Sequence, residues 1–171
     1  MRIRARLGTG APEAQERLTH LVETLNQGIA LKRRIIEDLH PSSLTNLGLA
    51  SALEILAREF GERAGILVEC TAQPVSLASA DRLTAYRLVQ EGLTNARKHS
   101  NASQTDVRLC YEPGCLEIEV SDNGRGATTT DQGGHGLAGM RERVTIYNGE
   151  FEAGPRPGGG FRLRARLPVP Q

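Results

Sequence analysis

The sequence predicts an α+β fold, in which a layer of helices covers one face of a mostly antiparallel sheet and a long helix precedes both. Three observations predict it. Apolar residues at helical spacing occupy most of the chain up to residue 99, whereas strand patterns come mainly after it, as pairs joined by turns. The 171 residues suit one domain with a short appendage. An apolar share of 39% is enough for a buried core.

The first helix is predicted from Glu13 to Leu39, before Pro41 breaks the pattern. Its apolar residues form a narrow row at alternating four- and three-residue steps, which Lys32 interrupts. The row consists of Leu18, Val22, Leu25, Ile29, Ile36 and Leu39. Such a row is typical of packing against a partner helix in a bundle or dimer, and the alternative is a single amphipathic helix that lies on its own domain. We therefore divide the chain into a helical segment, residues 1–40, and a domain, residues 41–171.

The domain is predicted to contain three further helices and five strands. The helices span residues 44–63, 79–99 and 137–147, and the strands span residues 66–71, 105–111, 116–120, 150–153 and 161–169. The turn Glu112-Pro113-Gly114 joins two of these strands, and Asn148-Gly149 ends the last helix.

Composition excludes several classes of function. The net charge is +1, and no basic stripe with interleaved aromatic residues indicates nucleic-acid binding. The arginines of the last strand alternate with apolar residues, which is typical of a solvated strand face: Arg162, Arg164 and Arg166. No apolar run approaches the ~20 residues of a membrane span, and no apolar stretch of a signal peptide follows the charged N-terminus.

The three cysteines, Cys70, Cys110 and Cys115, show no metal-ligand spacing. They are expected to be free thiols in a reducing compartment. We therefore expect a soluble, cytoplasmic chain without nucleic-acid or membrane contact, although a longer parent protein would have room for a membrane anchor.

The first polar cluster lies on the predicted helix 79–99. One stripe of this helix is apolar and should face the core: Leu83, Tyr86, Val89, Leu93 and Ala96. A second stripe carries Glu91, Asn95, Lys98 and His99. A carboxylate and an amide oxygen one turn apart suit Mg²⁺, which takes one or two protein oxygens beside phosphate and water. The alternative is an ordinary solvated helix face.

The second cluster follows the strand 116–120, where Asp122 continues the apolar face of Leu116, Ile118 and Val120. A carboxylate that enters a core needs a partner, and an adenine amino group is a suitable donor. The glycines of Asp122-Asn123-Gly124-Arg125-Gly126 would let the backbone approach a ligand closely. The alternative is a turn aspartate in an Asp-Asn-Gly hairpin.

The third cluster, Gly133 to Arg141, leads directly into the helix 137–147. Backbone N–H groups at the start of a helix form a natural phosphate site. Gly134 to Gly139 also fits the dinucleotide pattern GxGxxG, which we reject because no apolar strand immediately precedes it and no acidic residue stands at position 159.

Together the clusters resemble sensor histidine kinases. Gln90-Glu91-Gly92-Leu93-Thr94-Asn95-Ala96-Arg97-Lys98-His99 resembles their N box, Asp122 to Gly126 their G1 box, and Gly134-His135-Gly136-Leu137-Ala138-Gly139-Met140-Arg141-Glu142-Arg143 their G2 box. Residues 37–49 resemble the segment that joins the dimerisation helices to the ATP-binding domain. The form Gly-Leu-x-Gly-Met-Arg-Glu-Arg is similar to that of the nitrate-sensor-like subfamily.

The resemblance covers residues 13–168 and implies a Bergerat-type (GHKL) α/β sandwich, with helices on one mixed, mostly antiparallel sheet, that binds ATP and Mg²⁺. It implies that Asp122 binds the adenine amino group, with Gly124 and Gly126 lining the base pocket, and that Asn95 ligates Mg²⁺ beside Glu91. The other residues expected at the nucleotide are Lys98, His99, Gly134, His135, Gly136, Leu137, Gly139 and Met140.

The chain departs from the family pattern at two places. The family usually has Gly-Thr before the last strand, where this sequence has Gly160-Phe161, so that a hydroxyl is replaced by a ring. The acceptor histidine of the subfamily is followed by an acidic residue, whereas the four histidines here are followed by Leu21, Pro41, Ser100 and Gly136. The acceptor is therefore expected upstream of residue 1 in a longer parent.

The resemblance implies the catalytic domain of a two-component sensor histidine kinase, which positions Mg-ATP for phosphoryl transfer and passes phosphate to a response regulator through the parent. A homodimer through the N-terminal helix is expected as a partner interaction. One alternative is a serine kinase of the anti-sigma-factor type, which shares the boxes. Chaperone and mismatch-repair ATPases have longer lids than residues 127–132 allow. The other alternative is a degenerate module that only dimerises or docks, which Phe161 favours.

Overall fold

A computed structural model describes residues 12–125 and 135–169, and the chain divides between Pro41 and Ser42 into two compact units. The first unit contains helix α1 (Pro12–Leu39). Five large apolar side chains of α1 are about half exposed: Leu21, Val22, Leu25, Ile29 and Leu31, at 43–58%. The helix predicted from Glu13 to Leu39 is thus present, with apolar side chains on its surface.

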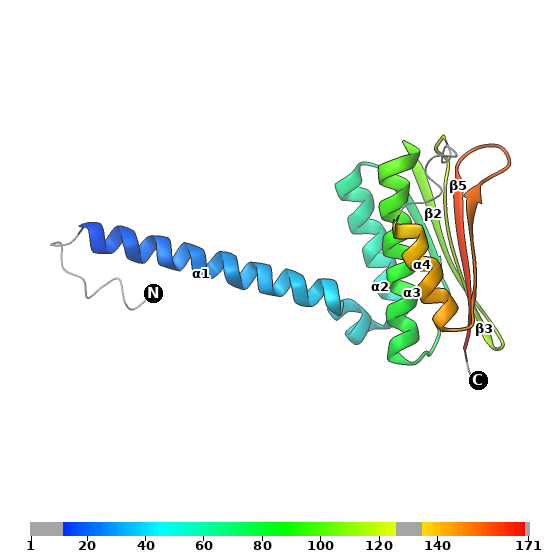
Figure 1. The fold of residues 1–171 in the computed structure, drawn as a ribbon, viewed down its shortest axis with the longest axis horizontal. Helices are drawn as coiled ribbons and strands as arrows, with labels where there is room; N and C mark the ends of the chain where they lie inside the picture. The colour runs from blue at the N-terminus through cyan, green and yellow to red at the C-terminus, as the bar shows by residue number, and fades with distance from the viewer. Residues whose placement is uncertain (1–11, 126–134, 170–171) are drawn as a thin grey trace. The chain divides into compact units, whose positions relative to one another are not determined.

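The second unit contains the sheet and the helices that cover it (Figure 1). In chain order its elements are α2 (Ser42–Ala64), β1 (Leu67–Ala72), α3 (Ser79–Asn95), η1 (Ala96–Ser100), β2 (Gln104–Glu112), β3 (Cys115–Asp122), α4 (His135–Ile146), β4 (Glu150–Pro155) and β5 (Phe161–Pro168). The five strands lie in the order β1-β2-β3-β5-β4. The β1–β2 pair is parallel and the other pairs are antiparallel. The predicted mixed, mostly antiparallel sheet is therefore confirmed.

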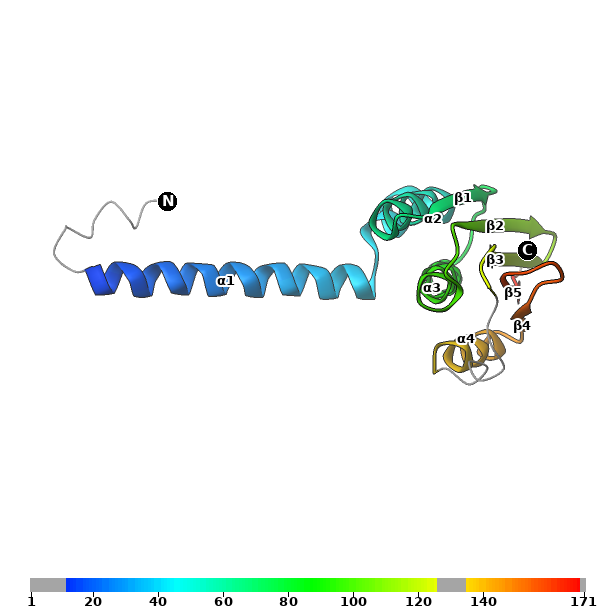
Figure 2. The same ribbon diagram turned by 90° about the horizontal axis from the view of Figure 1, so that it is seen from above.

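Helices α2, α3 and α4 lie on the same side of the sheet (Figure 2), as predicted. The side chains that face them alternate along each strand and form the core. On β3 these are Leu116, Ile118 and Val120, each at most 4% exposed, and on β5 they are Leu163, Ala165 and Leu167. The apolar stripe of α3 packs on this inner face, where Val89 and Leu93 are fully buried.

The outer face of the sheet carries charges that pair with one another. Glu117 of β3 accepts a hydrogen bond from Arg164 of β5 at 2.7 Å and lies 3.2 Å from Arg166 Nε. Arg166 also lies 3.9 Å from Glu150 of β4. The predicted solvated face of the last strand thus carries ion pairs that link β3, β5 and β4.

Two features of the helices were not predicted. Helix α2 is kinked at Gly48, whose φ of 81° is a conformation that favours glycine. The helix predicted over residues 79–99 ends as α-helix at Asn95 and continues as a π-helical turn, Ala96–Ser100. Within the described ranges, every helix is too short or too polar to traverse a lipid bilayer.

Candidate functional site

Two segments that are distant in sequence meet at one end of the sheet. A Cβ atom at Gly92 of α3 would lie 3.0 Å from a methyl carbon of Val120 on β3. Further along, the carbonyl oxygen of Ser100 accepts a hydrogen bond from the N–H of Arg125 at 2.9 Å. These contacts bracket Asn95 on one segment and Asp122 on the other. The two residues predicted to hold the metal and the base therefore belong to the same end of the unit.

Asp122 ends β3 with its side chain buried at 4% exposure. Its Oδ1 accepts a hydrogen bond from the N–H of Gly124 at 2.8 Å. Among the described residues, no cationic side chain forms an ion pair with this carboxylate. The turn that was considered as an alternative is present, but the next described element is helix α4 rather than a hairpin strand. The carboxylate is therefore a buried acceptor with unused capacity for hydrogen bonds from further donors.

The loop after β3 is held against η1. A Cβ atom at Gly124 would lie 2.1 Å from the carbonyl oxygen of Ser100, so that only glycine fits there. Asn123 strengthens the loop, because its Oδ1 accepts hydrogen bonds from the N–H groups of Ser103 and Gln104, both at 3.0 Å. The second glycine of the predicted base pocket, Gly126, lies outside the described residues.

Glu91, Asn95 and the start of α4 converge. A Cβ atom at Gly136 would lie 2.7 Å from Oε1 of Glu91 and 3.7 Å from Oδ1 of Asn95. The Nδ2 atom of Asn95 is buried and has no hydrogen-bond partner. Two side-chain oxygens thus lie beside the start of α4, and oxygens of this kind are what a hard cation bound mainly by phosphate and water accepts from a protein. The described residues contain no cluster of three or more histidine, cysteine or acidic side chains that would hold a metal without such help.

The other residues predicted to contact the nucleotide differ in their exposure and in the elements that carry them. Lys98 and His99 are exposed on η1, where the wider π turn shifts them from the α-helical stripe assumed for them. His135 begins α4, and Leu137 is half-buried. Met140 is 1% exposed and belongs to the core, and a Cβ atom at Gly139 would meet nothing within 4 Å. Gly134 lies outside the described residues, and the contacts of this whole group with nucleotide stay predictions.

One buried polar residue beside Asp122 was not predicted from the sequence. Thr105 of β2 is 0% exposed, its hydroxyl has no partner, and in the sheet register it lies opposite Asp122. Its signal in the sequence is the alternation of β2, which places Thr105 on the same inner face as Val107 and Leu109.

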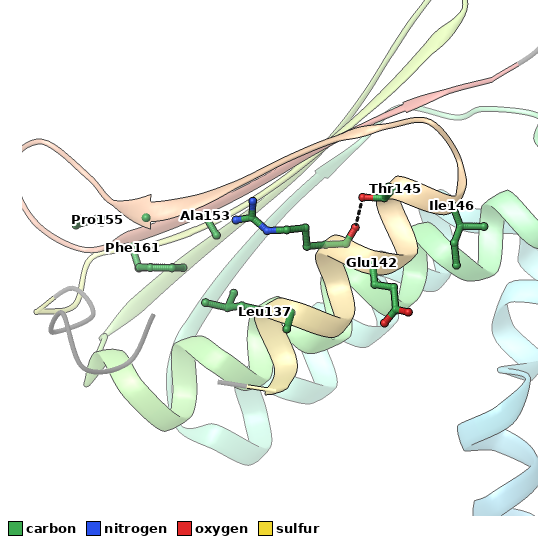
Figure 3. Close-up of a pocket in the computed structure, with 10 residues that line it drawn as sticks. Leu137, Glu142, Thr145, Ile146, Ala153, Pro155 and Phe161 are labelled. Atoms are coloured by element: carbon green, nitrogen blue, oxygen red, sulfur yellow. Dashed lines mark hydrogen bonds between the residues drawn. The ribbon is translucent and has the colours of Figure 1, made fainter. Parts of the chain in front are cut away.

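A cavity of about 680 Å³ lies between α4 and the strands β4 and β5. Figure 3 shows Leu137 and Phe161 pointing toward each other across it. Nearby, the guanidinium of Arg141 lies 5.6 Å from the ring centre of Phe151, a packing contact typical of a cation–π pair. Neither Asp122 nor Asn95 lines this cavity, so it is distinct from the predicted base and metal positions.

The unit thus has a helical layer on one face of a mixed sheet, a buried acid at a strand end and an acid–amide pair on a covering helix, an arrangement that suits a nucleotide-binding domain. Residues 80–171 match the family described as histidine kinase-, DNA gyrase B-, and HSP90-like ATPase. This match spans more than half of the chain, which therefore belongs to that family.

The relatives narrow the class further. The chain is 31% identical over 168 residues to the signal transduction histidine-protein kinase/phosphatase DegS of Brevibacillus brevis, a match that covers 94% of this chain and 42% of that protein. It is 36% identical over 134 residues to UhpB of Salmonella typhimurium, which covers 75% of this chain and 27% of that protein. The chain thus spans less than half of the relatives' length.

Solved structures agree with the sequence relatives. The histidine kinase domain of the blue-light-activated kinase of Erythrobacter litoralis EL346 matches with a TM-score of 0.63 and 25% identity, over 71% of this chain and 61% of that one. The chain therefore contains the ATP-binding catalytic domain of a sensor histidine kinase of the nitrate-sensor-like group. The resemblance based on the three boxes is confirmed.

Proposed function

We propose that this domain holds Mg-ATP so that its γ-phosphoryl group is transferred to a histidine that is none of the four in this sequence. The observation that carries the proposal is the buried carboxylate of Asp122, which has no cationic partner among the described residues and lies at the same end of the sheet as Glu91 and Asn95. A buried acid without a cation is costly unless a donor reaches it. The 6-amino group of adenine supplies that donor.

Each group has a distinct role in this proposal. Asp122 accepts the hydrogen bond of the base, and Asn95 Oδ1, with Glu91 beside it, faces the cation. When bound, Mg²⁺ neutralises the charge that develops on the phosphate oxygens. The N–H groups at the start of α4, near Gly136, bind phosphate. Phosphoryl transfer needs positioning and charge stabilisation more than covalent help, so no nucleophile of this chain is required.

The remaining partners follow from the same proposal. A histidine upstream in a longer parent receives the phosphate, and a response regulator takes it from there. The exposed row on α1, including Val22, Leu25 and Ile29, packs against the same helix of a second copy. The chain acts in the cytoplasm, where its three free cysteines stay reduced.

The direct test is calorimetric titration with a non-hydrolysable ATP analogue and Mg²⁺. We expect Asp122→Asn to weaken binding by about 10- to 100-fold, because a charge-assisted hydrogen bond contributes roughly 1.5–3 kcal/mol. Asn95→Ala should weaken binding only when Mg²⁺ is present. Glu119→Gln, on the outer face of the same strand, is the matched control and should bind like the wild type. Absence of heat from the wild-type chain at millimolar nucleotide would favour the degenerate module.

A labelling experiment tests the acceptor. With γ-labelled ATP, the chain alone should stay unlabelled, whereas a parent fragment with the upstream helix should gain an acid-labile label, as phosphohistidine does. An acid-stable label on a protein partner would instead support the serine-kinase alternative.

A further inference from the structure

The hydroxyl group of Thr105 is an anomaly on the inner face of the sheet. Its side chain is 0% exposed and its Oγ1 has no hydrogen-bond partner. The next inward residues of β2, Val107 and Leu109, are apolar and equally buried. Valine has nearly the shape of threonine and would fill the same space without leaving a polar atom unpaired. The hydroxyl therefore calls for an explanation other than packing.

The cross-strand neighbour of Thr105 is Asp122. The two residues are paired in the antiparallel register of β2 and β3, and both are buried on the inner face. Side chains in such a pair have Cβ atoms about 4.5–5.5 Å apart, within reach of a hydrogen bond after a rotamer change. The carboxylate accepts one backbone hydrogen bond, from Gly124, and two carboxylate oxygens have capacity for more.

We propose that Thr105 is a positioning residue for base recognition, whose hydroxyl donates to the Asp122 carboxylate when a nucleotide is bound. This inference rests on the proposed function. The 6-amino group of the base draws one carboxylate oxygen toward itself, and the carboxylate can turn about its χ2 bond. Donors from Gly124 and Thr105 fix the plane of the carboxylate, so that one lone pair points at the amino group. Thr105 thereby increases the preference for bases that carry this amino group without touching the base.

The test compares two nucleotides on two variants by calorimetry in Mg²⁺. The nucleotides are an ATP analogue and the matching purine nucleotide that lacks the 6-amino group. Thr105→Val should weaken ATP-analogue binding by about 3- to 10-fold and change binding of the 6-deamino nucleotide by less than twofold. Thr105→Ser, which keeps the hydroxyl, should restore the ratio of the two affinities. Thermal unfolding of both variants verifies that they fold.

A double-mutant cycle separates positioning from a general effect on the pocket. If Thr105 acts through Asp122, Thr105→Val should add less than twofold to the loss caused by Asp122→Asn. The proposal is overturned if Thr105→Val weakens both nucleotides equally, leaves their ratio unchanged, or adds its full effect to Asp122→Asn. Failure of the wild-type chain to bind the ATP analogue would overturn the proposed function as well, whereas binding with an unchanged ratio would overturn this inference alone.

Discussion

The two faces of the sheet differ in how their polar side chains are paired and buried. On the outer face, Glu117, Arg164 and Arg166 pair across neighbouring strands and keep contact with water. On the inner face, β3 buries Leu116, Ile118 and Val120 in succession. Polar side chains enter this inner face at one end, where Thr105 and Asp122 lie opposite each other.

The difference supports the proposal that a ligand supplies the missing hydrogen-bond partners on the inner face. A surface carboxylate such as Glu117 is satisfied by arginines of the adjacent strand. The carboxylate of Asp122 has only a backbone N–H among its described partners, and the hydroxyl of Thr105 has none. Unpaired polar groups in a core are costly, so the Asp122 carboxylate, the Thr105 hydroxyl and the Asn95 amide support the proposal that a nucleotide binds at this end of the sheet.

The largest expected effect comes from removing an inner side chain. Ile118→Ala should lower the free energy of unfolding by about 2–5 kcal/mol, because the residue is fully buried and its removal leaves a cavity. Glu119→Ala, at the next position on the outer face, should change it by about 0.5 kcal/mol or less. Urea unfolding of both variants measures the contrast. Equal losses would show that the two faces do not differ in the way described.

The contrast between the inner and outer faces of the sheet could be predicted in part from the sequence alone. Alternation along residues 116–120 identified the inner face and placed Asp122 on it, because a strand has only two faces. The i, i+4 spacing of Glu91 and Asn95 identified the acid–amide pair on α3. Both predictions use short-range geometry, which repeats in every helix and strand.

Features set by long-range contacts were not predictable. The significance of Thr105 depends on its register with Asp122, 17 positions along the chain, and a single strand pattern does not reveal that pairing. The π turn after Asn95 and the kink at Gly48 do not follow from the spacing of apolar residues, because tertiary context can override helical propensity. The close contact of Gly136 with Glu91 is likewise visible only in the folded unit.

A second prediction uses the cysteines, which lie on different faces. Cys70 packs against the core, and burial, with a smaller contribution from Glu54, raises the pKa of its thiol to about 11. Cys110 is exposed on the outer face. Each pKa unit lowers the thiolate fraction tenfold, so Cys70 should react with iodoacetamide at pH 8 on the order of 100-fold more slowly than an unshifted thiol.

Mass spectrometry of the intact and the denatured chain measures these rates. In denaturant, Cys70 and Cys110 should react at similar rates, which serves as the internal control. Modification of Cys70 in the folded chain as fast as that of Cys110 would contradict the assignment of Cys70 to the inner face.

The smallest expected change in the free energy of unfolding comes from a substitution on the outer face. The hydrogen bond from Arg164, together with the charges of Arg164 and Arg166, holds the pKa of Glu117 below its ordinary value. Glu117→Gln should lower the free energy of unfolding at pH 7 by only about 0.2–1 kcal/mol, because water and salt screen a surface pair. Glu59→Gln, in the exposed 3.6 Å pair with Arg63 on α2, is the matched control and should have a still smaller effect.

The pH dependence of the stability difference between the wild type and Glu117→Gln follows from the lowered pKa of Glu117. Because the pKa of Glu117 is lower in the folded chain than in the unfolded chain, its contribution is fully present above the unfolded value of about 4.3. It is lost as the pH falls through the lower folded value, when the carboxylate is protonated in both states. The gap between the wild type and Glu117→Gln should therefore narrow in urea titrations repeated from pH 7 downward, and 1 M salt should narrow it at pH 7. A gap that persisted unchanged in acid would mean that Glu117 contributes through packing rather than charge, and the ionic description of the outer face would be wrong.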